Sequence, residues 1–179
     1  MRVTALRLGR ELLSAQTIQG RVRELAGQIS GDYASIDRPL VLLTVLKGSV
    51  CFATDLSRNL TLPVNFDYVA VSSYGAGTES SGHVQLLKDL TMDVAGRDVL
   101  MIEDIIDTGL TTSFLFEHVQ RHRPASLKLC VLLNKQERRV TQVPLAYKGF
   151  DIPNHFVVGY GLDFDELYRN LAAVHILEP

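Results

Sequence analysis

The sequence predicts an open, mostly parallel α/β sheet with helices on both faces, and three observations lead to this fold class. First, apolar stretches suited to strands occur at residues 39–46, 66–72, 98–104 and 126–133. Second, all but one of these stretches are almost continuous in Val, Leu and Ile, which is typical of parallel strands buried on both faces. Third, helical patterns alternate with the strands, as in βαβ units. They cover residues 9–29, 49–60 and 113–123.

The remainder of the chain predicts a small subdomain. Two weaker strand candidates, residues 156–158 and 174–177, lie in a segment rich in Gly, Pro and aromatic residues that begins at Pro144. This segment breaks the alternation of strands and helices. A chain of 179 residues is short enough to be one domain. We therefore expect a single domain, residues 1–179, in which residues 144–179 and the N-terminal segment form a hood over the sheet edge.

Composition and charge argue against several classes of protein. The formal net charge is −2 and 21% of residues are charged, so the chain has no basic excess for binding a nucleic-acid backbone. No apolar stretch approaches the length of a membrane span. Cys51 and Cys130 lie in apolar surroundings, which is typical of buried, reduced cysteines. We therefore expect a cytoplasmic protein that binds neither nucleic acid nor membranes.

The most informative stretch runs from Val99 to Thr112. An apolar strand ends here on two adjacent carboxylates, Glu103 and Asp104, and a third, Asp107, opens a turn of small and hydroxyl-bearing residues. Carboxylates at the end of a core strand need a cation or a hydroxyl partner. Small residues entering a helix form a pocket for phosphate, because free N–H groups and the helix dipole point there. The stretch thus indicates a nucleotide or sugar-phosphate site, although an acidic helix-capping loop is the simpler structural interpretation.

The run Glu-Asp-Ile-Ile-Asp-Thr-Gly at residues 103–109 resembles the signature with which type I phosphoribosyltransferases bind 5-phosphoribosyl-1-pyrophosphate (PRPP). Within that family it is most similar to the branch that uses hypoxanthine and guanine. The resemblance implies that Glu103 and Asp104 bind the ribose hydroxyls and Mg²⁺. It also implies that backbone N–H groups and hydroxyls bind the 5′-phosphate. These belong to Asp107, Thr108, Gly109, Leu110, Thr111 and Thr112. Leu110 departs from the family pattern, because some relatives carry lysine there.

A second motif, Lys47-Gly48, follows a predicted strand and precedes a predicted helix. By itself it is as typical of an ordinary strand-to-helix turn as of an anion-binding loop, in which lysine supplies charge and glycine a close backbone approach. The resemblance implies a pyrophosphate-binding loop in which the peptide bond between Lys47 and Gly48 is cis. It also implies that Arg169 contacts the pyrophosphate.

Later residues complete the implied site. Lys135 directly follows a predicted strand, where a lone lysine is more often solvated than functional. The resemblance makes Lys135 the donor to the exocyclic oxygen of a 6-oxopurine. It implies that Phe156 stacks on the purine and that the Val157 backbone reads the purine edge. It further places Asp163 in this region as the ligand of a second Mg²⁺.

The polar loop after residue 72 is expected to be a lid. It is long and rich in Ser and Gly, so it cannot bury a core of its own. Gly75 and Gly77 suggest a dinucleotide fingerprint, but Ser80 replaces its third glycine. Ser73 and Tyr74 instead resemble the family's mobile loop. Such a lid would keep water from a cationic sugar centre.

Two further polar groups are expected to lie on the surface. His118 and His122 have the four-residue spacing of metal ligands on a helix, but the sequence offers no third ligand nearby except Glu117. We therefore interpret them as a surface pair rather than a zinc site. Asp165 and Glu166 are interpreted as a solvated acidic face.

The resemblance as a whole implies a purine salvage enzyme with Mg²⁺ as its cofactor. It would transfer the 5-phosphoribosyl group of PRPP to N9 of hypoxanthine, guanine or both, giving IMP or GMP and pyrophosphate. Asp107 is the expected catalytic base, accepting the proton from N7. Alternatives are a regulatory PRPP-fold protein that binds nucleotide and RNA, a transferase for xanthine or a pyrimidine, and a flavodoxin-like binding module. Apolar residues 66–71 and the family's usual assembly predict a homodimer or homotetramer.

Overall fold

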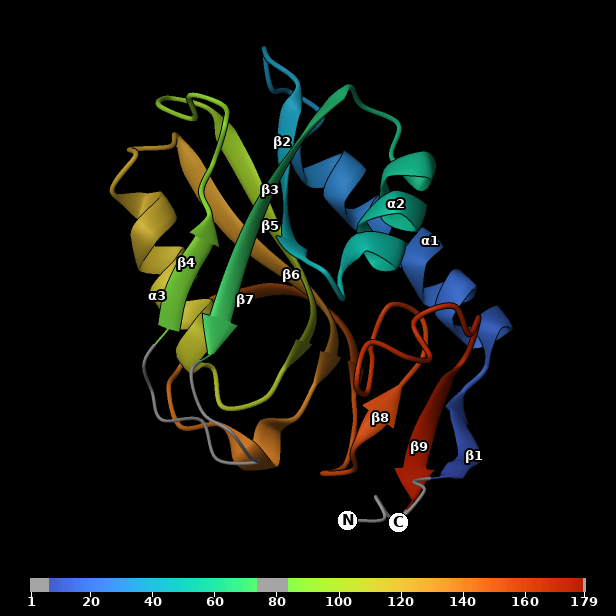
Figure 1. The fold of residues 1–179 in the computed structure, drawn as a ribbon. Helices are drawn as coiled ribbons and strands as arrows, with labels where there is room; N and C mark the ends of the chain where they lie inside the picture. Colours follow the sequence, from blue (N-terminus) through green and yellow to red (C-terminus); the bar gives the residue numbers. More distant parts are fainter. Residues whose placement is uncertain (1–6, 74–83, 179) are drawn as a thin grey trace.

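The computed structural model describes residues 7–73 and 84–178, and its main feature is a six-stranded sheet (Figure 1). The strands are β2 (Leu40–Leu46), β3 (Val64–Ser73), β4 (Val84–Lys88), β5 (Asp98–Ile106), β6 (Ser126–Asn134) and β7 (Leu145–Asp151). Their order is β4-β3-β2-β5-β6-β7. Every neighbouring pair is parallel except β3 with β4. The open, mostly parallel sheet is therefore confirmed.

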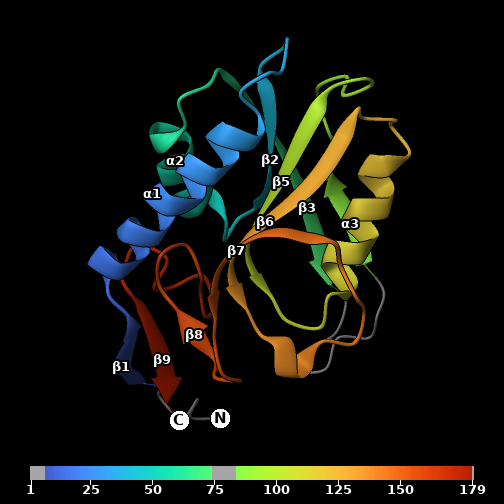
Figure 2. The same ribbon diagram turned by 180° about the vertical axis from the view of Figure 1, so that it is seen from behind.

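Helices cover both faces of this sheet, as predicted (Figures 1 and 2). They are α1 (Ala15–Asp32), α2 (Val50–Asn59) and α3 (Leu110–Gln120), and a short 3₁₀ helix, η1 (Gln136–Arg138), follows β6. α1 and α2 pack on one face, where Ile18, Leu25 and Phe52 are fully buried in one core cluster. α3 packs on the other face, where Leu115 and Val119 join a second cluster. The continuous apolar strands thus contribute side chains to both core clusters, one on each face of the sheet.

A second sheet, which we call the hood sheet, has three antiparallel strands in the order β1-β9-β8. They are β1 (Arg7–Leu13), β8 (Val157–Val158) and β9 (Val174–Glu178). Figure 1 shows this sheet below α1. The hood was expected to begin at Pro144. Residues 145–151 instead form β7 and extend the main sheet beside β6, so the hood begins only after Asp151.

The helix predicted at residues 9–29 is wrong in its first part. Residues 7–13 form β1, and α1 begins after Ser14, whose hydroxyl accepts a hydrogen bond from the N–H of Thr17 at 3.1 Å. β1 pairs with β9 at the other end of the chain. Local periodicity does not reveal such a long-range pairing. β4 and β7 were also not predicted, because both are short, partly exposed strands at the edges of the sheet.

Within the described ranges, none of the helices combines the length and apolar character that crossing a bilayer would require.

Asp67 on β3 holds the segment after β4 against the sheet. Its side chain is 1% exposed. It accepts hydrogen bonds of 2.8–2.9 Å from the N–H groups of Tyr68, Thr91 and Met92 and from the Thr91 hydroxyl. Burial raises the pKa of Asp67, but these hydrogen bonds lower it by more. The resulting pKa lies below the ordinary value of 3.8.

Asp67→Asn is expected to lower the free energy of unfolding by about 1–3 kcal/mol at neutral pH, because the amide leaves buried N–H donors unpaired. The pKa of Asp67 is lower in the folded than in the unfolded protein. Its contribution is therefore complete above about pH 4 and is lost as the pH falls further. Urea unfolding at about pH 7 and about pH 3.5 should show a smaller difference between variant and wild type at the lower pH. Asp37→Asn, at an exposed carboxylate, is the control. An equal difference at both pH values would contradict this role.

Candidate active site

A cavity of about 430 Å³ lies where β5 and β6 end and the hood begins. Ligands in open α/β sheets bind at this edge, beyond the carboxyl ends of the strands. The cavity is lined by Asp104, Ile105, Asp107, Thr108, Lys135, Arg138, Phe156, Val157, Leu162 and Asp163. The structure thus brings together the predicted base-binding residues, the proposed catalytic carboxylate and two of the three predicted metal ligands.

A smaller cavity of about 180 Å³ adjoins the first one, because Ile105, Asp107 and Thr108 line both. Its other lining residues are Glu103, Gly109, Thr111 and Thr112. We call this cavity the phosphate cradle. It is the turn that the sequence predicts as a phosphate site, and it opens beside the larger cavity.

The turn before α3 requires glycine. Gly109 has φ 84°, and a Cβ there would lie 2.5 Å from the carbonyl oxygen of Thr141. α3 begins directly afterwards at Leu110, not at Ser113 as predicted. Thr111 and Thr112 therefore lie in its first turn, where backbone N–H groups have no partner within the helix. These N–H groups and the Thr111 hydroxyl suit an anion.

The adjacent carboxylates of β5 serve different cavities. Successive residues of a strand face opposite sides, so Glu103 points toward α3 and accepts a 2.5 Å hydrogen bond from the hydroxyl of Thr112. Asp104 lines the larger cavity on the other side. Burial raises the pKa of Glu103 to about 8 and that of Asp104 to about 6. A cation or a sugar hydroxyl would compensate this burial.

The Lys47-Gly48 turn reaches the cavity edge beside Asp104. A Cβ on Gly48 would overlap the Asp104 carboxylate, and a Cβ on Gly161 would overlap the Gly48 carbonyl oxygen. Only glycine therefore lets the turn pass between the strand end and the hood. The expectation of a cis bond between Lys47 and Gly48 is wrong by one residue. The cis peptide bond joins Leu46 to Lys47.

Charged side chains from the turn and the hood form one cluster. Lys47 Nζ lies 3.0 Å from Glu166 Oε2, and the Arg169 guanidinium lies 2.8 Å from Asp163 and 3.4 Å from Glu166. The pKa of Glu166 is lowered chiefly by its hydrogen bond from Lys47. Glu166 is exposed, as expected, but it also bridges the two cations assigned to pyrophosphate. Asp165, beside it, is exposed.

Asp107 lies between two cations. Its carboxylate is 3.9 Å from Lys135 Nζ and 3.2 Å from Arg138 Nε. Lys135 is only 6% exposed, and burial lowers its pKa. Sequence reasoning missed Arg138 on the cavity wall and also Arg139, which donates to the Asp107 carbonyl oxygen at 3.2 Å. The signal available was the pair of arginines shortly after Lys135.

The hood supplies the apolar wall of the larger cavity. Phe156 is 51% exposed and meets Phe164 edge to face, with ring centroids 5.7 Å apart. Val157 is buried and begins β8. The exposed ring of Phe156 is thus available to stack on a flat ligand. Ser73, assigned to the lid, ends β3, whereas Tyr74 lies outside the described residues.

The chain matches the family described as "Phosphoribosyl transferase domain" over residues 9–165. It is 51% identical over 172 residues to the hypoxanthine-guanine phosphoribosyltransferase of Mycobacterium avium, covering 94% of this chain and 85% of that protein. The protein of the same name from Staphylococcus epidermidis is 46% identical over 167 residues, covering 93% and 92%.

Solved structures agree with these relatives. A hypoxanthine-guanine phosphoribosyltransferase from Bacillus anthracis has a TM-score of 0.89 at 44% identity, covering 95% of this chain and 99% of that one. A hypoxanthine phosphoribosyltransferase from Staphylococcus aureus has a TM-score of 0.90 at 43% identity, covering 96% and 92%.

Gly48→Ala is expected to destabilise the protein by about 1–3 kcal/mol, because the added methyl group displaces the half-buried Asp104 carboxylate. Gly27→Ala in α1 is the control, since a Cβ there meets nothing within 4 Å. In a helix this change should stabilise by about 0.5–1 kcal/mol. Urea unfolding curves of both variants and the wild type measure the difference. Equal stability of the two variants would show that the turn has room for a side chain.

Proposed function

The chain belongs to the phosphoribosyltransferase family, and on that premise we propose that it is a hypoxanthine-guanine phosphoribosyltransferase. It transfers the 5-phosphoribosyl group of PRPP to N9 of hypoxanthine, guanine or both. The products are IMP or GMP and pyrophosphate. The observation that carries this proposal is the pair of adjoining cavities, one suited to phosphate and one to a flat base, which share Asp107.

The phosphate cradle accounts for recognition of the 5′-phosphate. Its donors are the N–H groups at the start of α3 and the hydroxyls of Thr108 and Thr111, whereas the Thr112 hydroxyl, also expected to donate to the phosphate, donates to Glu103. Leu110 adds no charge where some relatives carry lysine. Arg139 lies beneath the turn, and the nearby Glu103 and Asp107 partly offset the lowering of its pKa by burial. We infer that Arg139 stabilises the backbone of the phosphate cradle through its hydrogen bond to the Asp107 carbonyl oxygen.

Asp107 accepts the proton that the purine base loses. The bond from N9 to C1′ of the ribose forms as the bond from C1′ to the pyrophosphate oxygen breaks, and the proton on N7 passes to the Asp107 carboxylate. The same negative charge stabilises the cationic sugar centre. Lys135 and Arg138 hold this carboxylate at the cavity wall.

Lys135 and the hood select the base. A buried ammonium group donates to the exocyclic oxygen of a 6-oxopurine, whereas adenine presents a donor at that position. The exposed ring of Phe156 stacks on the purine, and the Val157 backbone reads its edge. The pyrophosphate group is bound by Lys47, Gly48 and Arg169, which lie near Asp104.

The carboxylates also fit Mg²⁺, which prefers oxygen ligands and keeps several waters. Asp104 and Asp163 line the same cavity, and the negative charge of Asp163 helps to raise the pKa of Asp104. We infer that Asp104, together with Glu103, would hold one Mg²⁺ and the ribose hydroxyls, and that Asp163 would hold a second Mg²⁺. When bound, Mg²⁺ neutralises charge that develops on the leaving pyrophosphate.

We further propose a homodimer or homotetramer. Phe66 and Tyr68 on β3 are each 36% exposed and stack with centroids 6.1 Å apart, and Leu87 on β4 is 64% exposed. Apolar side chains gathered on neighbouring strands suit contact with a second copy. Cys51 and Cys130 are free thiols, which agrees with action in the reducing cytoplasm.

Asp107→Asn is expected to reduce turnover about 100- to 10,000-fold, because the amide cannot accept a proton. Pyrophosphate release from PRPP and Mg²⁺ is measured with hypoxanthine, guanine, xanthine, adenine or uracil offered singly. Affinity for PRPP, measured by calorimetry, should change little. Asp37→Asn is the exposed control and should match the wild type. Absence of turnover by the wild type with every base, with PRPP binding retained, would instead favour a regulatory nucleotide-binding protein.

Lys135→Gln is expected to reduce the preference for hypoxanthine over adenine by about tenfold, because an amide can donate to an oxo group or accept from an amino group. The ratio of kcat/KM for the two bases measures this preference. Lys148→Gln removes a lysine that is 41% exposed on β7 and should leave the ratio unchanged. An unaltered ratio in the Lys135 variant would assign base selection to other residues.

A further inference from the structure

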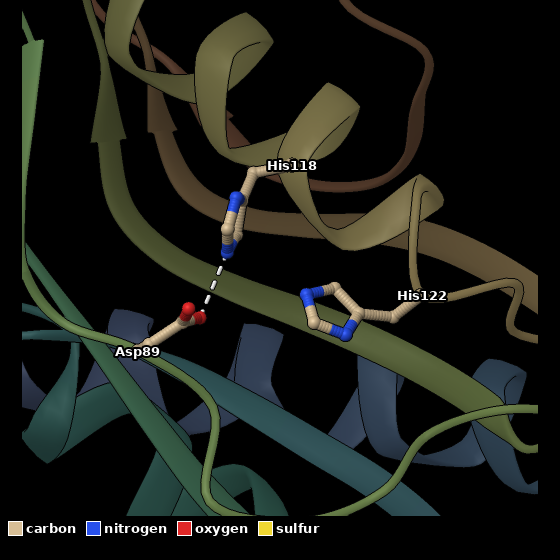
Figure 3. Close-up of side chains that lie close together, drawn as sticks. All are labelled: Asp89, His118 and His122. Carbon is tan, nitrogen blue, oxygen red and sulfur yellow. Dashed lines mark hydrogen bonds and ion pairs between the residues drawn. The ribbon is translucent and has the colours of Figure 1, made fainter.

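Away from the two cavities, three side chains with metal-binding groups converge beside α3 (Figure 3). His118 lies on α3, His122 lies in the turn that follows it, and Asp89 follows β4. One ligand atom from each of the three lies within 4.8 Å of the others. The third ligand that the sequence did not offer thus comes from a segment 29 residues before His118.

The geometry of these groups suits one small ion. Nε2 of His118 lies 2.8 Å from Oδ1 of Asp89, and the two imidazole rings meet edge to face with centroids 5.3 Å apart. Figure 3 shows a nitrogen of the His122 ring facing the gap toward the other two side chains. Ligands about 2.0–2.2 Å from a tetrahedral zinc ion lie about 3.3–3.5 Å from one another. Small side-chain rotations are therefore enough to bring all three to such an ion.

The backbone that carries these ligands is anchored in the core. Leu115 and Val119 on the inner side of α3 are fully buried. Leu86 and Leu90, on either side of Asp89, pack against the same cluster. Two segments far apart in sequence are thus held at a fixed separation, and an ion would need little reorganisation to bind between them.

A simple ion pair between His118 and Asp89 explains only part of this arrangement. Such an exposed pair contributes little to stability, and in the described part of the chain no hydrogen bond engages the His122 side chain. Lys88 donates to the carbonyl oxygens of Tyr68 and Asp89 rather than to the Asp89 carboxylate.

We propose that Asp89, His118 and His122 bind one divalent transition-metal ion, with Zn²⁺ as the best match, which links the end of β4 to the end of α3. Two imidazoles and a carboxylate are donors that zinc accepts, and the partial exposure of the three side chains leaves a fourth position open to water. His118 is about 12 Å along the helix axis from Leu110, at 1.5 Å per residue. None of the three proposed ligands lines either cavity, so the site is separate from the carboxylates assigned to Mg²⁺.

Zinc and cobalt titrations test this proposal on the full chain. In a calorimetric titration, Zn²⁺ is added to the protein in a buffer with excess Mg²⁺, which occupies the acidic cavity. The wild type should show one Zn²⁺ site. His118→Gln, His122→Gln and Asp89→Asn should each weaken it at least about tenfold. His155→Gln, at an exposed histidine in the hood, is the matched control and should bind Zn²⁺ like the wild type. Co²⁺ in place of Zn²⁺ should give the visible absorption of a tetrahedral site in the wild type but not in His122→Gln.

Thermal unfolding supplies a second measurement. A hundredfold excess of Zn²⁺ over its Kd should raise the Tm of the wild type by about 5–10 °C and leave the Tm of His122→Gln unchanged. Circular dichroism shows which variants are folded, and Asp89→Asn provides the comparison should a histidine variant unfold. Zinc binding of equal strength in wild type and His122→Gln would overturn the proposal. Absence of a Zn²⁺ site in the wild type would overturn it as well.

Discussion

Burial of two carboxylates at the end of β5 is the constraint on which the active-site edge depends. Glu103 is 4% exposed and Asp104 is half-buried at the end of a core strand, and a carboxylate withdrawn from water requires a partner. Because the two point to opposite sides of the sheet, each needs partners of its own. Thr112 supplies them from α3, and Gly48 and Arg169 approach from the other side. A helix, a turn and the hood are thereby drawn to one edge.

The phosphate cradle depends on a second, steric constraint. Gly109 brings the chain from β5 into α3 through a left-handed conformation, directly against the carbonyl oxygen of Thr141. Thr108 accepts hydrogen bonds from the N–H groups of Val140 and Thr141, and Arg139 donates to Asp107 from the same segment. The segment after β6 therefore stabilises the phosphate cradle through these hydrogen bonds. The N–H donors of the phosphate cradle can face a ligand, because the backbone carbonyls of the turn accept hydrogen bonds from the segment after β6.

Opposite charges already fill the region assigned to pyrophosphate. Glu166 lies between Lys47 and Arg169, and Asp163 is also paired with Arg169. An anionic ligand placed between the two cations would compete with Glu166 for them. These are exposed or half-exposed pairs, which contribute little to stability and are readily exchanged. The hood carboxylates can thus position Lys47 of the turn and Arg169 of the hood without blocking them with strong interactions.

The parallel core strands β2, β3, β5 and β6 and the signature on β5 could be predicted from the sequence. Continuous apolar runs predict buried parallel strands, and the run of acidic, hydroxyl-bearing and small residues at 103–109 predicts the cradle, because both are local patterns. Tertiary structure alone decided that residues 7–13 pair as a strand with β9, and that Arg138 stands beside Asp107. It also decided that Asp89 meets the histidines of α3. Contacts between segments distant in the chain leave no trace in local periodicity, because folding of the whole core sets their separation.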